Sequence, residues 1–304
     1  MHPQTSTPWP ALPLNEWQDT QMALHLWTQI VGKIKLKLTP HINHWWNTAL
    51  HITSSGLTSD LIHYPKGCFQ MDFDFINHQM LIRVEDGKTE VIELRTRTVA
   101  DFYAETMEKL KAIGVEVKIW TQPVEMEFKT HFEKDNLVRE YKPEYVDRFW
   151  KILLETDSVA KQFRSRFSGK VSPVNFFWGS FDLAHTFFSG RMAPAHPGGV
   201  PNVGDQVMSE AYSRELCSFG FWPGEGLGEP AYYAYSYPEP AGYKEQKVKP
   251  EAAYYHIDIK EFILPYEAVR TSENPSQALL SFIESTFEAA FSLQKWDAHL
   301  YKQK

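Results

Sequence analysis

The segment richest in residues that could do chemistry runs from residue 174 to residue 191 and reads VNFFWGSFDLAHTFFSGR. If this segment is one strand, its side chains alternate between two faces, and Trp178, Ser180 and Asp182 point the same way. A hydroxyl and a carboxylate beside a tryptophan need partners, because burying an unpaired polar group costs roughly 2–7 kcal/mol. The partners are either polar groups of a neighbouring strand or a ligand. We therefore predict Ser180 and Asp182 as candidate catalytic residues.

Arg191 ends the same segment, and an arginine can hold an anionic group through two parallel hydrogen bonds. If Asp182 is buried, desolvation raises its pKa, as a general acid or base requires. We therefore add Arg191 to the candidate catalytic residues. Aromatic side chains further along the chain suit the walls of a site for a small organic ligand, although a purely structural core is the alternative. The candidate ligand-binding residues are Trp178, Glu215, Trp222 and Tyr235.

Several familiar catalytic motifs are absent from the sequence. Gly169-Lys170 lacks the earlier glycine of a phosphate-binding loop, and Ser180 is not in a Gly-x-Ser-x-Gly turn. Twelve histidines leave room for a metal site assembled from distant positions, with His41 and His44 as the closest pair. No carboxylate or cysteine stands beside them at ligand spacing. We therefore predict no metal ligand, and the sequence indicates no particular cofactor.

The composition limits the classes of partner. The 304 residues are 43% hydrophobic and carry a formal net charge of -7, which opposes binding to nucleic acid and to anionic membranes. Cys68 and Cys217 lie far apart without a Cys-x-x-Cys spacing, and the first residues lack an export signal. No stretch approaches the roughly 20 apolar residues that span a bilayer. We predict a reduced, soluble, cytoplasmic protein with a small-molecule ligand, and we make no prediction of its oligomeric state.

Hydrophobic periodicity and turn signals predict alternating blocks of helix and strand. Thr98 followed by Asp101 is a capping signal, Gly114 ends the helix that begins there, and Pro143 suits the first turn of another. The Asn274-Pro275 pair begins the last helix. A first helix is predicted over residues 16–33, and strands are predicted over residues 44–52, 68–75, 80–85, 91–95, 216–221, 232–237 and 255–262.

A short repeat suggests that the chain contains two copies of one unit. TPHINHWW at residues 39–46 and SPVNFFW at residues 172–178 place Asn43 and Asn175, and likewise Trp46 and Trp178, 132 residues apart. We predict an α+β fold of two tandem similar units, residues 1–128 and 129–304. Each unit is an antiparallel sheet covered by helices, and the two are related by a pseudo-two-fold axis. Chance similarity is the alternative.

The second unit is predicted to hold the site. At the same offset, Leu50 matches Asp182, so the carboxylate is present in the second copy only. The region from residue 190 to residue 250 also contains nine of the sixteen glycines and eight of the nineteen prolines. Long loops of this composition are more often functional than structural.

Three segments together resemble a known family: residues 163–191, the GFWPG turn at residues 220–224, and residues 232–240. The chain is similar over nearly its whole length to an uncharacterised, mainly bacterial family catalogued as a domain of unknown function. The resemblance implies no activity, cofactor or catalytic residue. We therefore predict a small-molecule-binding protein or enzyme with an Asp/Arg/aromatic pocket in the second unit. The alternatives are a structural or protein-interaction module and a histidine-based metalloenzyme.

Overall fold

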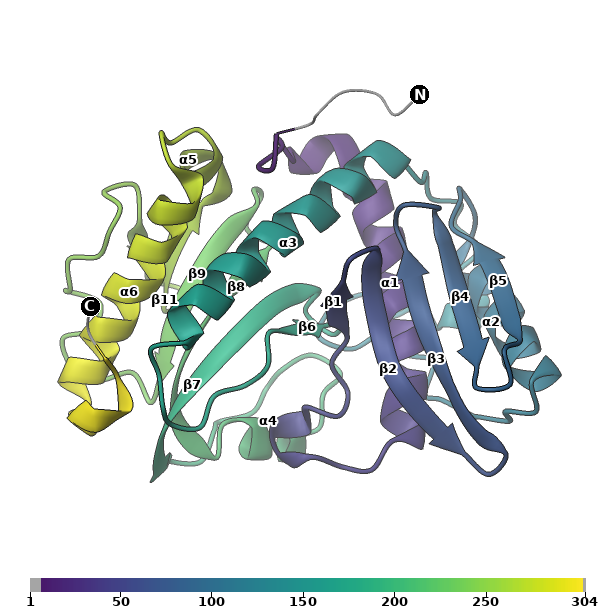
Figure 1. Ribbon diagram of the computed structural model, residues 1–304, viewed down its shortest axis with the longest axis horizontal. Helices are drawn as coiled ribbons and strands as arrows, with labels where there is room; N and C mark the ends of the chain where they lie inside the picture. The colour runs from purple at the N-terminus through teal and green to yellow at the C-terminus, as the bar shows by residue number, and fades with distance from the viewer. Residues whose placement is uncertain (1–6, 303–304) are drawn as a thin grey trace.

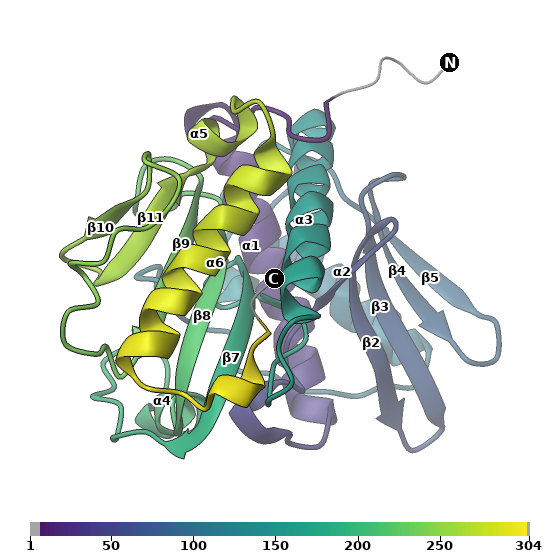
Figure 2. The same cartoon turned by 60° about the vertical axis from the view of Figure 1, so that its left-hand side comes forward.

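Two antiparallel sheets and the helices around them make up residues 7–302, the part of the chain that the computed structural model describes. The predicted α+β class is confirmed. Helix α1 (Leu14–Leu38) lies between the two sheets and contacts one helix and one strand of the first half and one helix of the second (Figures 1 and 2). One continuous hydrophobic core contains buried residues of both halves, among them Trp27 and Phe163.

The first half, residues 7–128, forms a five-stranded sheet in the order β1-β2-β3-β4-β5. Phe69, Met71 and Phe73 alternate along β3 and point into the core, as expected for a strand with one buried face. The strands predicted over residues 68–75, 80–85 and 91–95 are confirmed to within two residues. The elements are β1 (His51–Thr53), β2 (Gly56–Tyr64), β3 (Gly67–Asp74), β4 (Gln79–Val84), β5 (Thr89–Glu93) and α2 (Val99–Ala112).

The second half, residues 129–302, forms a six-stranded sheet in the order β10-β11-β9-β8-β7-β6. Helices α3 (Pro143–Arg164) and α6 (Pro275–Leu293) lie side by side across one face of this sheet (Figure 2). The opposite face carries Tyr233 and Tyr235, and it is the face that bounds the candidate site. The remaining elements are β6 (Asn175–Phe177), β7 (Asp182–Met192), α4 (Asp205–Ala211), β8 (Arg214–Trp222), β9 (Ala231–Tyr237), β10 (Tyr254–His256), β11 (Glu261–Pro265) and α5 (Tyr266–Arg270).

Local capping signals place the helix starts correctly. The Thr98 side chain accepts a hydrogen bond from the backbone N–H of Asp101 (3.0 Å), and α2 begins at the next residue. Asn274 caps α6 in the same way, and Pro275 occupies its first turn. Pro143 likewise opens α3. These predictions are confirmed because a cap depends on residues within one turn of each other.

The prediction of a single strand through residues 174–191 is wrong. The chain folds back at residues 178–181, so β6 and β7 form an antiparallel hairpin in which Phe177 pairs with Asp182. Phe181 adopts a left-handed backbone conformation with φ 57°, which the turn requires. Trp178, Ser180 and Asp182 therefore do not alternate along one strand. They come together because the turn folds their side chains to one side of the sheet, where all three line one cavity.

Two other strand predictions are also wrong. Residues 44–52 contain a short 3-10 helix, η1 (Asn43–Trp45), and only the end of this segment joins β1. Residues 255–262 divide into β10 and β11, which pair with each other as a hairpin. The predicted repeat also falls on unlike structures, since Asn43 lies in η1 whereas Asn175 begins β6. The halves share a broader order of a long helix, antiparallel strands and a closing helix. The strand orders differ, because the first sheet is a simple meander whereas β11 lies between β9 and β10 in the second.

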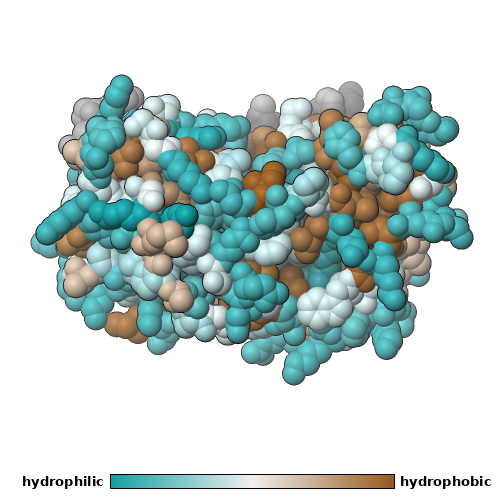
Figure 3. Space-filling model, turned by 90° about the horizontal axis from the view of Figure 1, so that it is seen from below, coloured by the Kyte–Doolittle hydropathy of each residue, from teal (hydrophilic) through white to brown (hydrophobic). Residues whose placement is uncertain are grey.

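The two sheets meet where Leu50 and Phe176 exchange two backbone hydrogen bonds (2.9 and 2.8 Å). This bridge joins the chain just before β1 to β6. Seen from below, hydrophobic side chains reach the surface in several patches among hydrophilic ones, most extensively on the side of the first sheet (Figure 3). No helix within residues 7–302 combines the length and apolar character needed to cross a bilayer.

Candidate functional site

A cavity of about 890 Å³ lies beside the face of the six-stranded sheet that α3 and α6 leave uncovered. Both halves line it: residues 33–48 and 118–125 come from the first, and residues 177–188 and 202–235 contribute from the second. A volume of this size suits a small organic ligand. Its aromatic wall consists of Trp45, Trp46, Trp120, Phe177, Trp178, Phe188, Tyr212, Tyr233 and Tyr235.

Two carboxyl groups meet in this cavity. Asp182 is buried at the start of β7, and its two oxygens accept hydrogen bonds from the hydroxyls of Ser180 and Tyr233. Glu125 comes from the irregular segment before α3, and its carboxyl group also hydrogen-bonds with Ser180. The Ser180 hydroxyl therefore lies between Glu125 and Asp182, which we call the acid pair.

The acid pair holds protons more tightly than ordinary carboxyl groups. Burial and, secondly, the nearby charge of Asp182 raise the pKa of Glu125 to about 7, against the opposing effect of the hydrogen bond from Ser180. Burial also raises the pKa of Asp182, although Ser180 and Tyr233 stabilise its charged form. With a pKa of about 7, Glu125 is partly protonated near neutral pH.

A polar stripe on α1 holds Glu125 in place. His25, Gln29, Lys33 and Lys37 follow one another at intervals of four residues, so they share one side of the helix. The Gln29 side-chain amide pairs with both the N–H and the C=O of Val124 (2.9 Å each). The segment that carries Glu125 is therefore anchored to α1 rather than left as a free loop.

The same stripe fixes the hairpin turn that carries Ser180. His25 donates from Nε2 to the carbonyl of Gly179 (2.8 Å). Gly179 lacks a side chain at the point where the Glu125 carboxyl packs, and a Cβ there would overlap Glu125 Oε1. The backbone N–H of Glu125 also donates to the carbonyl of Pro201 (2.9 Å). Contacts with α1, with the hairpin turn and with Pro201 thus fix the segments that carry the two carboxyl groups.

Left-handed backbone conformations are concentrated around the cavity. Nine non-glycine residues within 7–302 have positive φ, and four of these line the cavity: His44, Trp45, Glu125 and Asn202. Such conformations cost about 1–3 kcal/mol each and persist where surrounding structure enforces them. The concentration of these backbone conformations around the cavity supports a functional role for the cavity.

Four of the predicted site residues line the cavity. Ser180 and Asp182 belong to the acid-pair network, while Trp178 and Tyr235 form part of the aromatic wall. The Trp178 indole donates to the backbone carbonyl of Thr48 (2.8 Å), which ties the hairpin turn to the first half. The hydroxyl of Tyr235 lies 2.9 Å from that of Tyr212.

The other three predicted site residues lie outside the cavity lining. Arg191 is exposed near the end of β7, where its Nε donates to Glu215 (2.6 Å) and its guanidinium donates to the carbonyl of Gln294 (2.6 Å). Trp222 packs with Tyr233 on the same sheet face. The structure therefore separates Arg191 from Asp182. The charge of Arg191 is neutralised by an ion pair with Glu215.

The sequence analysis missed Glu125 and Lys33. Glu125 lies in a segment without regular secondary structure, so no periodicity could have indicated it. Lys33 had a signal, because His25, Gln29 and Lys33 follow one another at intervals of four residues in the middle of a helix rich in apolar residues. All three are buried in the structure.

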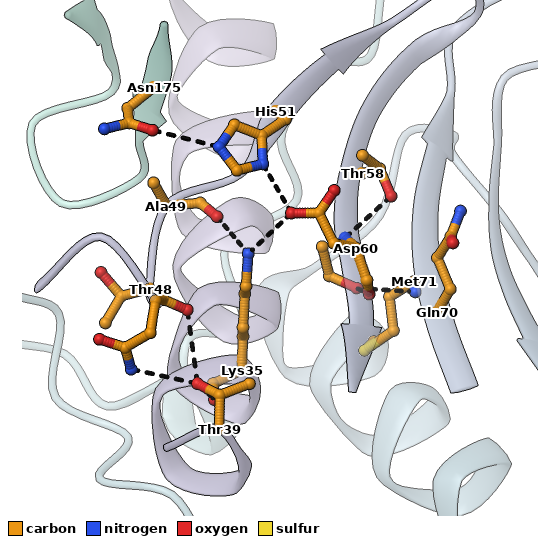
Figure 4. A network of polar contacts seen from close by, with 12 residues as sticks. Lys35, Thr39, Thr48, Ala49, His51, Thr58, Asp60, Gln70, Met71 and Asn175 are labelled. Carbon is orange, nitrogen blue, oxygen red and sulfur yellow. Dashed lines mark hydrogen bonds and ion pairs between the residues drawn. The ribbon is translucent and has the colours of Figure 1, made fainter. Parts of the chain in front are cut away.

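A second polar network joins the two sheets (Figure 4). The Lys35 ammonium donates to the carbonyl of Ala49 (2.5 Å) and lies 3.3 Å from Asp60. Asp60 lies 2.6 Å from Nδ1 of His51, whose Nε2 lies 3.1 Å from Asn175 Oδ1 at the start of β6. The network links α1, β1, β2 and β6, and it does not line the cavity.

Across residues 7–302, no three His, Cys, Asp or Glu side chains gather as a metal site would require.

Comparison with known proteins gives a family but no activity. No curated protein matches the chain, and no solved structure matches it. Residues 9–303 match the model of one protein family, which is described as a family of unknown function. The match covers nearly the whole chain, so the protein belongs to the family of unknown function DUF5996.

Proposed function

We propose that the protein binds a small organic molecule in the 890 Å³ cavity and transfers protons to and from it through the acid pair. One observation carries this proposal: two carboxyl groups, Glu125 and Asp182, meet through one serine hydroxyl inside an aromatic cavity. A buried carboxyl such as Asp182, with the carboxyl of Glu125 facing the same cavity beside it, is costly to keep for stability alone, because its charge loses hydration.

The arrangement supports separate roles for the two groups. Glu125 has a pKa of about 7 and faces the cavity, so it can donate a proton to a bound ligand near neutral pH. Asp182 in its charged form, which the hydrogen bonds from Ser180 and Tyr233 stabilise, can accept a proton from the ligand. Ser180, which hydrogen-bonds with both groups, can then return a proton from Asp182 to Glu125. A reaction that needs an acid and then a base, such as a hydrolysis or an isomerisation, fits this pair.

The test is a thermal-shift screen of the purified protein against a collection of metabolites, followed by mass spectrometry of each hit for turnover. We expect at least one hit whose shift disappears in Ala184→Phe, because Ala184 lines the cavity and a phenylalanine there would fill it. Glu125→Gln keeps the shape of the side chain without its acidic proton. It should retain the thermal shift and lose turnover.

Glu251→Gln is the matched control, since Glu251 is an exposed glutamate outside the cavity lining. It should change neither binding nor turnover. Hits that bind equally well to the Ala184→Phe variant would refute the cavity as the binding site. Turnover that survives both Glu125→Gln and Asp182→Asn would refute the acid pair as its catalyst and leave binding alone.

We also propose that the two halves derive from one duplicated unit. Their common order of a long helix, antiparallel strands and a closing helix supports this origin, with the insertion of β11 between β9 and β10 as a later difference. The cavity would then occupy the junction between the two copies.

A further inference from the structure

Three lysines line the cavity beside the tryptophan wall. Lys33 and Lys37 lie one turn apart on α1, and Lys118 comes from the segment that carries Trp120. The Lys33 ammonium lies 4.8 Å from the centre of the Trp120 ring and donates to the carbonyl of Gln122 (2.6 Å). We call Lys33, Lys37 and Lys118 the lysine cluster.

Within the part of the chain that the structure describes, the lysine cluster has no acidic counterion. Among residues 7–302, none of the three lysines forms an ion pair with an acidic side chain. Lys33 is buried, and burial alone lowers its pKa to about 8, with no carboxylate close enough to raise it again. A buried ammonium without a counterion is unfavourable unless a ligand supplies one.

The charge balance of the cavity also favours a bound anion. Among the described residues, the only acidic ones in its lining are Glu125 and Asp182, and the pKa of each is raised. Three lysines therefore face at most two carboxylate charges, in a chain whose formal net charge is -7. The cavity is locally positive in a protein that is negative as a whole, which favours an anion inside it.

We propose that the lysine cluster is an anion subsite of the cavity, so that the ligand is a flat apolar molecule carrying a carboxylate, phosphate or sulfonate group. This inference rests on the proposed function, because it assigns a ligand class to the same cavity. The aromatic wall takes the apolar body, the lysine cluster takes the anion, and the acid pair meets the rest of the molecule.

Two fluorescent probes that differ in one group test the subsite. The anionic probe is 8-anilinonaphthalene-1-sulfonate, and the neutral one is N-phenyl-1-naphthylamine, which has the same rings without the sulfonate. We expect the anionic probe to bind about tenfold more tightly to the wild-type protein, as expected when a few weakly screened charges contribute. The double variant Lys37→Gln/Lys118→Gln should remove most of that preference and leave the neutral probe unchanged.

Lys247→Gln is the control, because Lys247 is exposed and does not line the cavity. It should change neither affinity. Lys33→Met adds a result that a purely structural role would not produce. The variant should bind the anionic probe more weakly. Its stability against urea should stay the same or rise, because the substitution removes a buried charge that has no counterion. In the wild type, the affinity for the anionic probe should also fall as the pH rises through about 8, where Lys33 loses its proton.

The outcomes separate the two proposals. If both probes bind the wild type equally, or if the lysine variants weaken both to the same extent, the anion subsite is refuted and ligand binding in the cavity stands. If neither probe binds the wild type, the anion subsite and the proposed function both fail. Displacement of the bound sulfonate probe by 1-naphthyl phosphate or 1-naphthoate, and not by the neutral 1-naphthol, would support the subsite and identify the preferred anion.

Discussion

Replacing Glu125 by glutamine should remove a pH dependence of stability that the acid pair creates. The pKa of Glu125 rises from 4.5 to about 7 in the folded protein, with burial as the main cause and the Asp182 charge as the second. A carboxyl group whose pKa is higher in the folded state than in the unfolded state stabilises the folded protein at low pH. That contribution is fully present below pH 4.5 and is lost as the pH rises through about 7.

The size of the effect follows from the same pKa difference. Each pKa unit corresponds to about 1.36 kcal/mol, so the full loss would be about 3 kcal/mol. The Glu125 side chain is exposed to the cavity, where solvent reduces the penalty, and we expect about half of that value, ~1.5 kcal/mol. Glutamine binds no titrating proton, so the stability of Glu125→Gln relative to wild type should rise by this amount between pH 5 and pH 8.

The assay is urea unfolding followed by far-UV circular dichroism at pH 5, 6, 7 and 8, with Glu251→Gln as the control. In an Asp182→Asn background, the effect of Glu125→Gln should be smaller, because the Asp182 charge that opposes ionisation of Glu125 is gone. A stability difference between wild type and Glu125→Gln that stays constant from pH 5 to pH 8 would show that Glu125 titrates as it does in the unfolded chain. The acid pair would then have no shared proton.

Two further predictions concern positions outside the acid pair itself. Gly220 leaves the space through which the Tyr233 hydroxyl reaches Asp182, and a Cβ there would overlap that hydroxyl and the carbonyl of Leu183. Gly220→Ala should therefore lower the free energy of unfolding by about 1–3 kcal/mol in urea titrations. The loss should be smaller in a Tyr233→Phe background, and strict additivity would contradict the proposed overlap. Asp60→Asn should reduce the loss of stability at acid pH. Burial raises the pKa of Asp60, but the interactions with His51 and Lys35 outweigh burial, so the net pKa is lowered. The stabilising charge of Asp60 is therefore lost as the pH falls. An unchanged acid limb of the stability profile would rule this out.

Local patterns were sufficient for the starts of α2, α3 and α6 and for three strands of the first sheet, whereas α1 continues to Leu38, beyond its predicted end at residue 33. The caps at Thr98 and Asn274 act within one helical turn, and the alternation of Phe69, Met71 and Phe73 records which side of β3 faces the core. Caps and strand alternation depend only on residues close together in the sequence, so they can be predicted from the sequence. The composition also indicated a large aromatic core, which the structure contains.

The candidate site shows where local reasoning ends. The sequence identified Ser180, Asp182 and Trp178 as residues with unusual neighbours, but it placed them on one strand, whereas a hairpin turn brings them together. It also grouped Arg191 with Asp182 because they are close in sequence, although the β7 strand carries Arg191 away to an ion pair with Glu215.

The sequence by itself determined the class of fold, the helix boundaries that depend on caps, and the residues that needed a partner. Only the tertiary structure decided which partners they have. Glu125 meets Ser180 because Gln29 on α1 anchors Val124, and the lysine cluster faces the acid pair's cavity because α1 lies between the two sheets. Periodicity records which side of an element is buried, whereas the meeting of two distant carboxyl groups depends on long-range packing that no local pattern contains.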